Sequence, residues 1–113
     1  MSTIHKMKLS KVPFEKILDG TKVIESRLYD EKRKLIDIGD LIEFSQNDSE
    51  NNKCTVEVVG LLRYANFSDL FSDFEPRYFG GKSEKELLLE IENFYSKEDQ
   101  KQYGVLGIKI KKI

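Results

Sequence analysis

Residues 20–27 read GTKVIESR, and residues 39–44 read GDLIEF. In the first segment a Gly-Thr turn leads into a short predicted strand that carries Lys22, Glu25 and Arg27. Three ionisable groups this close together on a strand are costly to hold near a core unless they have partners. A bound polar ligand is a natural partner. The stretch therefore predicts a strand with a polar site built on it.

Length and composition describe an ordinary globular chain. The 113 residues predict one domain over residues 1–113, with 39% apolar and 35% charged residues. No apolar run approaches the roughly 18 residues that a membrane-spanning helix needs, and the first residues lack a signal-peptide pattern. We therefore expect a cytoplasmic protein with no membrane partner.

Cysteine and histidine are too few for several kinds of site. Cys54 is the single cysteine and His5 the single histidine, so the sequence predicts neither an internal disulfide nor a Cys/His or two-His metal site. We expect no metal and no cofactor. Cys54 alternates with Val56 and Val58, which is typical of a packed strand residue. The alternative, thiol catalysis with His5, has no support in the pattern.

Charge is distributed unevenly along the chain. Residues 1–34 hold nine Lys or Arg against five Asp or Glu, although the whole chain has a net charge of −1. A basic first third on an acidic remainder favours a local site for a phosphate or a short nucleic acid over a broad polyanion-binding face. The alternative is a solvated surface with no ligand.

Periodicity predicts alternating strands and helices. The predicted strands cover residues 4–9, 22–29, 41–46, 53–65 and a final stretch after Gly104, with a polar loop at 47–52 and a bend or bulge at Gly60. The first predicted helix covers residues 11–19, and the second starts at Asn66 or Ser68 and runs through Phe74. A third follows a Ser83–Glu86 capping box, with an apolar stripe as far as Phe94 and Tyr95, and a short fourth begins at Ser96. The fold class is therefore α+β, a small, bent, mostly antiparallel β-barrel with flanking helices.

Several segments resemble the ASCH domain family, in its small bacterial single-domain form. They are the helix before Gly20, the pattern G-x-K-x-x-E-x-R at 20–27, Gly39-Asp40 with the strand after it, and YGVLGI at 103–108. The resemblance implies the PUA-like fold and a cleft beside the barrel lined by Lys22, Glu25 and Arg27. It also implies RNA or a modified nucleoside as partner.

One branch of these proteins is similar to N4-acetylcytidine amidohydrolases. Lys22 matches the catalytic Lys of that branch, while Glu25 stands where the branch has a Thr. The branch also uses a Glu that would fall near residues 80–81, which are both Gly here; Glu75 and Glu84 are the nearest carboxylates.

The side-chain chemistry allows two roles for the same residues. A Lys beside a second cation such as Arg27 is pushed toward neutrality, and Lys22 could then act as a base or nucleophile with Glu25 as acid or base. Glu25 has the opposite effect, because it stabilises the ammonium form. That effect suits the binding of a polar edge or a phosphate. The plain alternative is an exposed Glu25–Arg27 ion pair.

Aromatic residues are crowded between residues 64 and 79. Phe67, Phe71 and Phe74 have helical spacing and are expected in the core. Arg77 and Tyr78 lie next to two glycines and are predicted to bind the ligand, with an aromatic face for a splayed base and a loop that could close over it.

Three functions follow from these observations. The first is binding of RNA or a modified nucleoside in the Lys/Glu/Arg cleft. The second is hydrolysis of N4-acetylcytidine or a related acylated nucleobase. The third is a role as a protein-interaction or regulatory domain without catalysis, and an exposed apolar patch over residues 71–79 would favour it. The sequence leaves catalysis open and indicates no particular protein partner.

Overall fold

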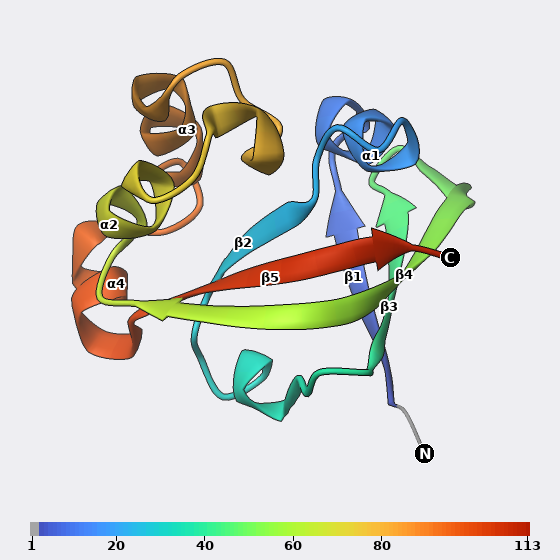
Figure 1. Cartoon of the computed structure of the whole chain (residues 1–113), viewed down its shortest axis with the longest axis horizontal. Coiled ribbons are helices and arrows are strands. Elements are labelled where there is room, and N and C mark those ends of the chain that lie inside the picture. Colours follow the sequence, from blue (N-terminus) through green and yellow to red (C-terminus); the bar gives the residue numbers. More distant parts are fainter. Residues whose placement is uncertain (1–2) are drawn as a thin grey trace.

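The computed structural model describes residues 3–113, which form one five-stranded sheet with helices around it (Figure 1). The strands are β1 (Ile4–Leu9), β2 (Ile24–Leu28), β3 (Leu41–Gln46), β4 (Ser49–Tyr64) and β5 (Val105–Lys112). The α-helices are α1 (Lys11–Leu18), α2 (Phe67–Ser72), α3 (Glu84–Ile91) and α4 (Lys97–Tyr103), and two 3₁₀ turns are η1 (Arg33–Leu35) and η2 (Pro76–Phe79).

The sheet is mixed but mostly antiparallel. Its strand order is β1-β3-β4-β5-β2, and only the β1–β3 pair is parallel among the described strands. The long strands β4 and β5 curl, so that the sheet forms a half-barrel with β1 and β2 as its two edges (Figure 1). The predicted α+β class, with a bent, mostly antiparallel sheet and flanking helices, is confirmed.

A bulge in β4 lets neighbouring side chains of this strand pack against two different hydrophobic clusters. The pairing with β5 shifts between Val58 and Gly60, which confirms the irregularity predicted at this glycine. A Cβ on Gly60 would lie 3.0 Å from the Lys109 side chain, so the close strand approach favours glycine. Beyond the bulge, Leu61 packs against one hydrophobic cluster and Leu62 against the other.

The two hydrophobic clusters lie on different sides of the sheet. The first joins β1, β3, β4 and β5 to α1, and the second joins β2 and β5 to α2, η2 and α3. Ile24 and Leu28 of β2 are buried in the second cluster. Because side chains alternate along a strand, Glu25 and Arg27 point the other way.

The edge of β1 is fixed to β3 by a turn around Asp40. This buried carboxylate accepts hydrogen bonds from the main-chain N–H groups of Thr3 (3.2 Å) and Asp37 (3.0 Å), and His5 Nε2 lies 2.8 Å from it. The hydrogen bond with His5, followed by that from Asp37, lowers the pKa of Asp40. Within the described structure His5 therefore has a structural partner, and Cys54 is packed in the core as predicted, where burial raises the pKa of its thiol.

Three local predictions were wrong. The predicted loop 47–52 is mostly strand: β4 begins at Ser49, only residues 47–48 form the turn, and the side chains of residues 50–52 are exposed. The Ser83 cap is present, but the Glu86 carboxylate accepts from the N–H of Lys82 and not of Ser83, so the predicted capping box is incomplete. Phe94 was expected on the apolar stripe but is 75% exposed, because α3 ends three residues earlier.

The capping pattern at Ser96 is confirmed as a complete capping box with Asp99. No helix in the described part of the chain is long and apolar enough to cross a membrane.

Candidate functional site

A cleft of about 570 Å³ opens between α1 on one side and α3, with the segment that follows it, on the other. Figure 1 shows β2 between α1 and α3, and residues 25–27 of this strand line the cleft. The volume is in the range of sites that hold one small organic ligand. Lys22, Glu25 and Arg27 all line it.

The chain before β2 is built to place Lys22 in this cleft. Helix α1 ends at Leu18, and Gly20 adopts a φ of +84°, a left-handed conformation that favours glycine and reverses the chain. The N–H of Lys22 donates to the carbonyl of Lys16 (3.0 Å), and the N–H of Val23 donates to the carbonyl of Tyr78 (2.8 Å). The strand is therefore held between α1 and η2 at the point where Lys22 leaves it.

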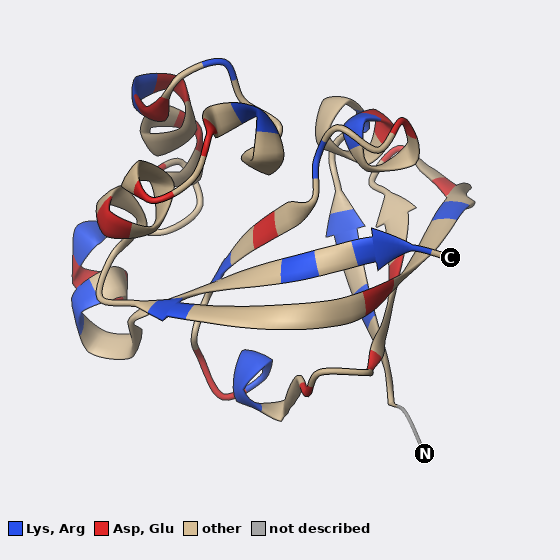
Figure 2. Ribbon diagram, in the orientation of Figure 1, with Lys and Arg blue, Asp and Glu red and all other residues tan. Residues whose placement is uncertain are grey.

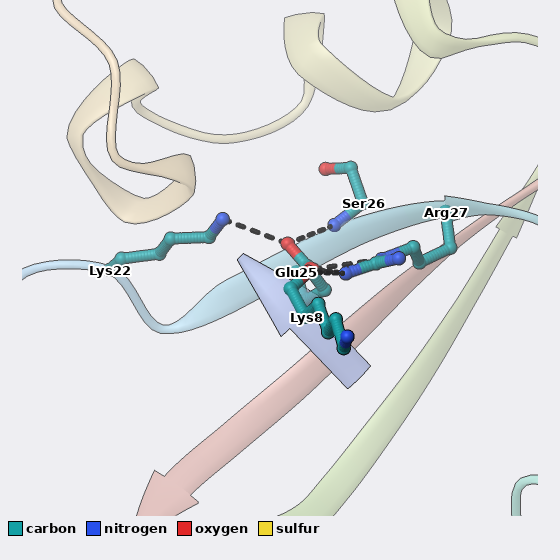
Figure 3. A network of polar contacts seen from close by, with 5 residues as sticks. All are labelled: Lys8, Lys22, Glu25, Ser26 and Arg27. Carbon is teal, nitrogen blue, oxygen red and sulfur yellow. Dashed lines mark hydrogen bonds and ion pairs between the residues drawn. The ribbon is translucent and has the colours of Figure 1, made fainter. Parts of the chain in front are cut away.

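Glu25 is the centre of the polar cluster in Figure 3. Its Oε1 accepts from Lys22 Nζ at 2.8 Å and from the N–H of Ser26 at 3.2 Å. Its Oε2 lies 2.9 Å from Arg27 Nε and 2.7 Å from Nη2. Arg27 Nη2 also donates to the main-chain carbonyl of Lys8 (3.2 Å), on the opposite edge strand.

The cluster carries a net positive charge and is largely buried, with the Arg27 side chain 15% exposed. Glu25 is 3% exposed and Lys22 8% exposed, and one carboxylate serves two cations. Burial alone would raise the pKa of Glu25, but the charges of Lys22 and Arg27 outweigh it and lower the pKa to about 2. The pKa of Arg27 is raised, since Glu25, with the Tyr95 hydroxyl as a smaller contributor, outweighs desolvation. At neutral pH the cluster therefore holds one negative and two positive charges.

The walls of the cleft add further charges and an apolar rim. Three more lysines line it, and the α3 wall contributes two carboxylates: Lys8, Lys16, Lys82, Glu86 and Glu90. The apolar lining includes Val12 and Pro13 on one wall and Phe79, Leu87, Ile91 and Phe94 on the other. The cleft thus combines a cationic base with an apolar rim.

The connection after η2 is packed tightly against Lys22. Gly80 has a φ of +88°, and a Cβ there would lie 3.2 Å from Lys22 Cδ. A Cβ on Gly81 would lie 2.5 Å from a methyl carbon of Leu87. Lys16 Nζ donates to the carbonyl of Gly80, so α1 and this connection are tied together above the Lys22 side chain. The two glycines allow this close fit.

The structure brings together Lys22, Glu25 and Arg27, but it places Arg77 and Tyr78 outside the cleft lining. The exposed guanidinium of Arg77 pairs with Glu75 at 2.6 Å and lies 5.2 Å from the centre of the Tyr78 ring. Tyr78 instead contributes its main-chain carbonyl to β2. A ligand-binding role for these two side chains stays a prediction.

Several cleft residues were missed at the level of sequence. Glu86 and Glu90 line the cleft, whereas Glu75 and Glu84, the carboxylates considered for this region, do not. The i,i+4 spacing of Glu86 and Glu90 does place them on one helix face, but it does not say what that face covers. Within residues 3–113 no three His, Cys, Asp or Glu side chains are grouped as a metal site would require.

Comparison with known proteins places this geometry in a family. The family model described as the ASCH domain matches residues 7–113. None of the curated proteins compared with the chain matches it.

Two similar solved structures cover nearly the whole chain. The hypothetical protein PH0355 is 36% identical with a TM-score of 0.87, over 98% of this chain and 100% of that one. Protein PF0455 from Pyrococcus furiosus is 32% identical with a TM-score of 0.75, over 98% of both chains. An origin in bacteria, part of the predicted resemblance, gains no support from them.

A more distant structure shares the fold alone. The ASCH protein from Zymomonas mobilis is 12% identical with a TM-score of 0.62, over 96% of this chain and 67% of that one.

Proposed function

This chain belongs to the ASCH domain family, and we propose that it binds single-stranded RNA or a modified nucleoside in the cleft above Lys22, Glu25 and Arg27. The observation that carries the proposal is an excess of one positive charge, because the buried Lys22 and the partly buried Arg27 share the single buried carboxylate of Glu25. A buried ion pair built only for stability would be neutral, because an uncompensated buried charge is costly. A ligand with a negative or strongly polar edge would supply the missing partner.

Lys22 is the group best placed to contact that ligand. Its ammonium carries three N–H donors, and Glu25 is the one hydrogen-bond acceptor it meets within residues 3–113. Arg27, in contrast, is occupied by Glu25 and by the carbonyl of Lys8. We assign Lys22 to direct contact with an acceptor atom of the ligand. Glu25 and Arg27 would hold the Lys22 side chain in place and form the rest of the polar surface that faces the ligand.

The distribution of charge favours a small ligand or a short segment over a long duplex. Figure 2 shows basic and acidic positions spread over the whole fold, with both signs on α1, β2, β4, α3 and α4, and the chain has a net charge of −1. Domains that bind long nucleic acids usually present a wide basic face. Here the local excess of cations lies at the base of a cleft of about 570 Å³, a size that suits one nucleotide unit.

Binding to a pool of short, labelled single-stranded RNAs at two salt concentrations, and to nucleosides by calorimetry, tests the proposal. We expect Lys22→Ala to weaken binding strongly and Lys6→Ala to leave it unchanged. Lys6 is a matched control, because it is an exposed lysine on the same face of β1 as Lys8 and lies outside the cleft lining. RNA binding that involves phosphates should weaken with salt more steeply than nucleoside binding. Absence of binding to both kinds of ligand by the wild-type protein would overturn the proposal.

Hydrolysis of an acylated nucleobase is the second candidate. It is favoured by the 2.8 Å contact between Lys22 and Glu25 inside a cleft of suitable size. However, a carboxylate whose pKa is about 2 is a weak base, and it already accepts a hydrogen bond from Lys22 Nζ. This electrostatic pattern supports binding ahead of catalysis. Liquid chromatography of N4-acetylcytidine incubated with wild type and with Lys22→Ala decides the matter, since turnover that is lost in the variant would establish an amidohydrolase.

A role as a protein-interaction domain has less support. That alternative called for an exposed apolar patch at residues 71–79, but Phe71 and Phe79 are buried in the second cluster and Phe74 and Tyr78 are partly buried against it.

A further inference from the structure

We infer that Phe94 is the stacking surface for an unpaired base in the cleft, opposite Val12. The inference rests on the proposed function and adds the residue and the ligand geometry to it. The Phe94 side chain is 75% exposed, although burial of a large aromatic ring would stabilise the fold. An exposed ring on the lining of a cleft is available for a ligand.

The main chain around Phe94 is held while its ring is left outside the core. The N–H groups of Phe94 and Tyr95 both donate to the carbonyl of Ile91 at 3.0 Å, which closes the last turn after α3. The neighbouring Tyr95 ring is partly buried and stacks on Phe67, with 5.8 Å between ring centres and an interplanar angle of 22°. The two adjacent aromatic residues therefore differ in role, since Tyr95 fixes the segment to the core and Phe94 projects from it.

Apolar groups meet the cleft from both walls. Val12 on α1 is 58% exposed and lines the cleft, and Ile91 lies on the same side as Phe94. Figure 1 shows α1 and α3 on opposite sides of β2. Val12 and Phe94 both line the cleft, so a flat ring bound in it could meet an apolar side chain on each face. Aromatic rings stack on bases of any sequence because every base has a π face.

The polar residues that line the cleft indicate which groups the ligand must carry on its edge. A ring held between Phe94 and Val12 would turn one edge toward Lys22 and Glu25, which are buried and can only be reached from within the cleft. That edge must carry hydrogen-bonding atoms, as the Watson–Crick edge of a base does. In a duplex this edge is already paired, so the geometry selects an unpaired base in a free nucleoside or a single-stranded segment. An aliphatic chain lacks the polar edge, and an inorganic phosphate lacks the apolar faces.

Three substitutions at Phe94 test the stacking role. Phe94→Ala removes the ring, Phe94→Leu keeps an apolar side chain without a π face, and Phe94→Trp keeps the π face. The control is Leu89→Ala, because Leu89 is 62% exposed on α3, the helix that precedes Phe94, but does not line the cleft. The probe is a short single-stranded RNA containing 2-aminopurine, whose fluorescence is quenched on stacking, measured against the same RNA paired to its complement.

We expect the wild-type protein to bind and quench the single-stranded probe and to bind the duplex much more weakly. Phe94→Ala should weaken binding roughly 5- to 150-fold, which corresponds to the loss of one base–aromatic stack, and should abolish the additional quenching. Phe94→Leu should lose the quenching as well, Phe94→Trp should restore both signals, and Leu89→Ala should behave as wild type.

Some results would overturn the stacking role alone, and another would overturn the proposed function as well. Wild-type binding that is unchanged in Phe94→Ala, or equal binding of single strand and duplex, refutes the stacking role while leaving the proposed function intact. Failure of the wild-type protein to bind the single strand or any free nucleoside refutes the proposed function and the inference with it.

Discussion

Arg27 Nη2 donates to the main-chain carbonyl of Lys8 at 3.2 Å, and so joins the two edge strands of the half-barrel. The same guanidinium holds the Glu25 carboxylate through Nε and Nη2. The polar cluster therefore lies at the open seam of the sheet and links β2 to β1. Changes in this cluster should affect both the binding of a ligand and the stability of the edges.

The Arg27→Lys substitution should keep the positive charge beside Glu25 but lose the link to the carbonyl of Lys8. A lysine keeps the positive charge but cannot reproduce the planar fork that reaches Glu25 and Lys8 together. We expect a loss of about 1–3 kcal/mol in the free energy of unfolding, since the carbonyl and the carboxylate each lose a charged donor. Urea denaturation measures it, with Arg77→Lys as control, because the Arg77–Glu75 pair is 66% and 61% exposed and should contribute little. Equal effects of the two substitutions would show that Arg27 does not join the edges.

Glu25→Gln should destabilise the protein more severely. The amide leaves the buried Lys22 and the partly buried Arg27 without their carboxylate, and breaking a buried pair in this way typically costs about 3–5 kcal/mol. The matched control is Glu50→Gln, since the Lys8–Glu50 pair at the same edge is largely exposed and should be worth less than about 1 kcal/mol. Denaturation curves of the three proteins check the expectation, and a Glu25→Gln variant as stable as the control would contradict a buried charged cluster.

The pH dependence of stability should carry the signature of Glu25. Its pKa is about 2 in the folded protein, below the value of 4.5 for an unperturbed Glu. A lowered folded-state pKa gives stabilisation that is fully present above the unfolded value and is lost as pH falls through the folded value. The contribution of about 3 kcal/mol should therefore decline between pH 4.5 and pH 2. Asp40, whose pKa is also lowered, adds to the total acid sensitivity of the wild type.

The difference between wild type and Glu25→Gln isolates this group from Asp40. We expect the gap in unfolding free energy to be constant above pH 5 and to narrow as the pH approaches 2, because protonated Glu25 resembles the amide. A gap that stays constant over this range would mean that the Glu25 pKa is not lowered by its neighbours.

Much of this site could be predicted from the sequence, because polar residues in a strand are unusual. Lys22, Glu25 and Arg27 could be predicted as site residues for that reason. Glu25 and Arg27 alternate with apolar neighbours such as Ile24, which places them on one side of the strand. Their closeness to the opposite edge strand could not be predicted. It depends on the curl of a sheet whose first and second strands lie at opposite edges.

Phe94 was misplaced for a different physical reason. The segment after Ile91 contains neither Gly nor Pro before residue 94, so Asn93 is the one residue there that favours a helix end, and it is a weaker signal than Gly or Pro. With a longer helix, Phe94 would continue the apolar stripe of Leu87, which is buried, and Ile91, which is partly buried. The actual end of α3 at Ile91 turns the chain and leaves the ring outside the core.

Gly80→Ala should reduce ligand binding in addition to stability. Its φ of +88° makes any L side chain strained, at a cost of about 1–2 kcal/mol, and the new Cβ would press on Lys22 at 3.2 Å. Gly39→Ala is the matched control, because Gly39 has a φ of +96° and no atom within 4 Å of its Cβ position. Both variants should lose similar stability in thermal unfolding.

Only Gly80→Ala should weaken binding of single-stranded RNA, since only this substitution displaces Lys22. Equal binding by the Gly80 and Gly39 variants would show that the position of Lys22 is unimportant for the ligand.

The most direct measurement is a map of amide chemical shifts in the ¹⁵N-labelled wild-type protein as a short single-stranded RNA is added. The account predicts that the largest shifts lie at residues 22–27, at Gly80 and Gly81 and around Phe94, and that Lys22→Ala removes them while Lys6→Ala does not. Shifts concentrated elsewhere, for example around η1 and the outer face of β4, would contradict the assignment of this cleft as the binding site.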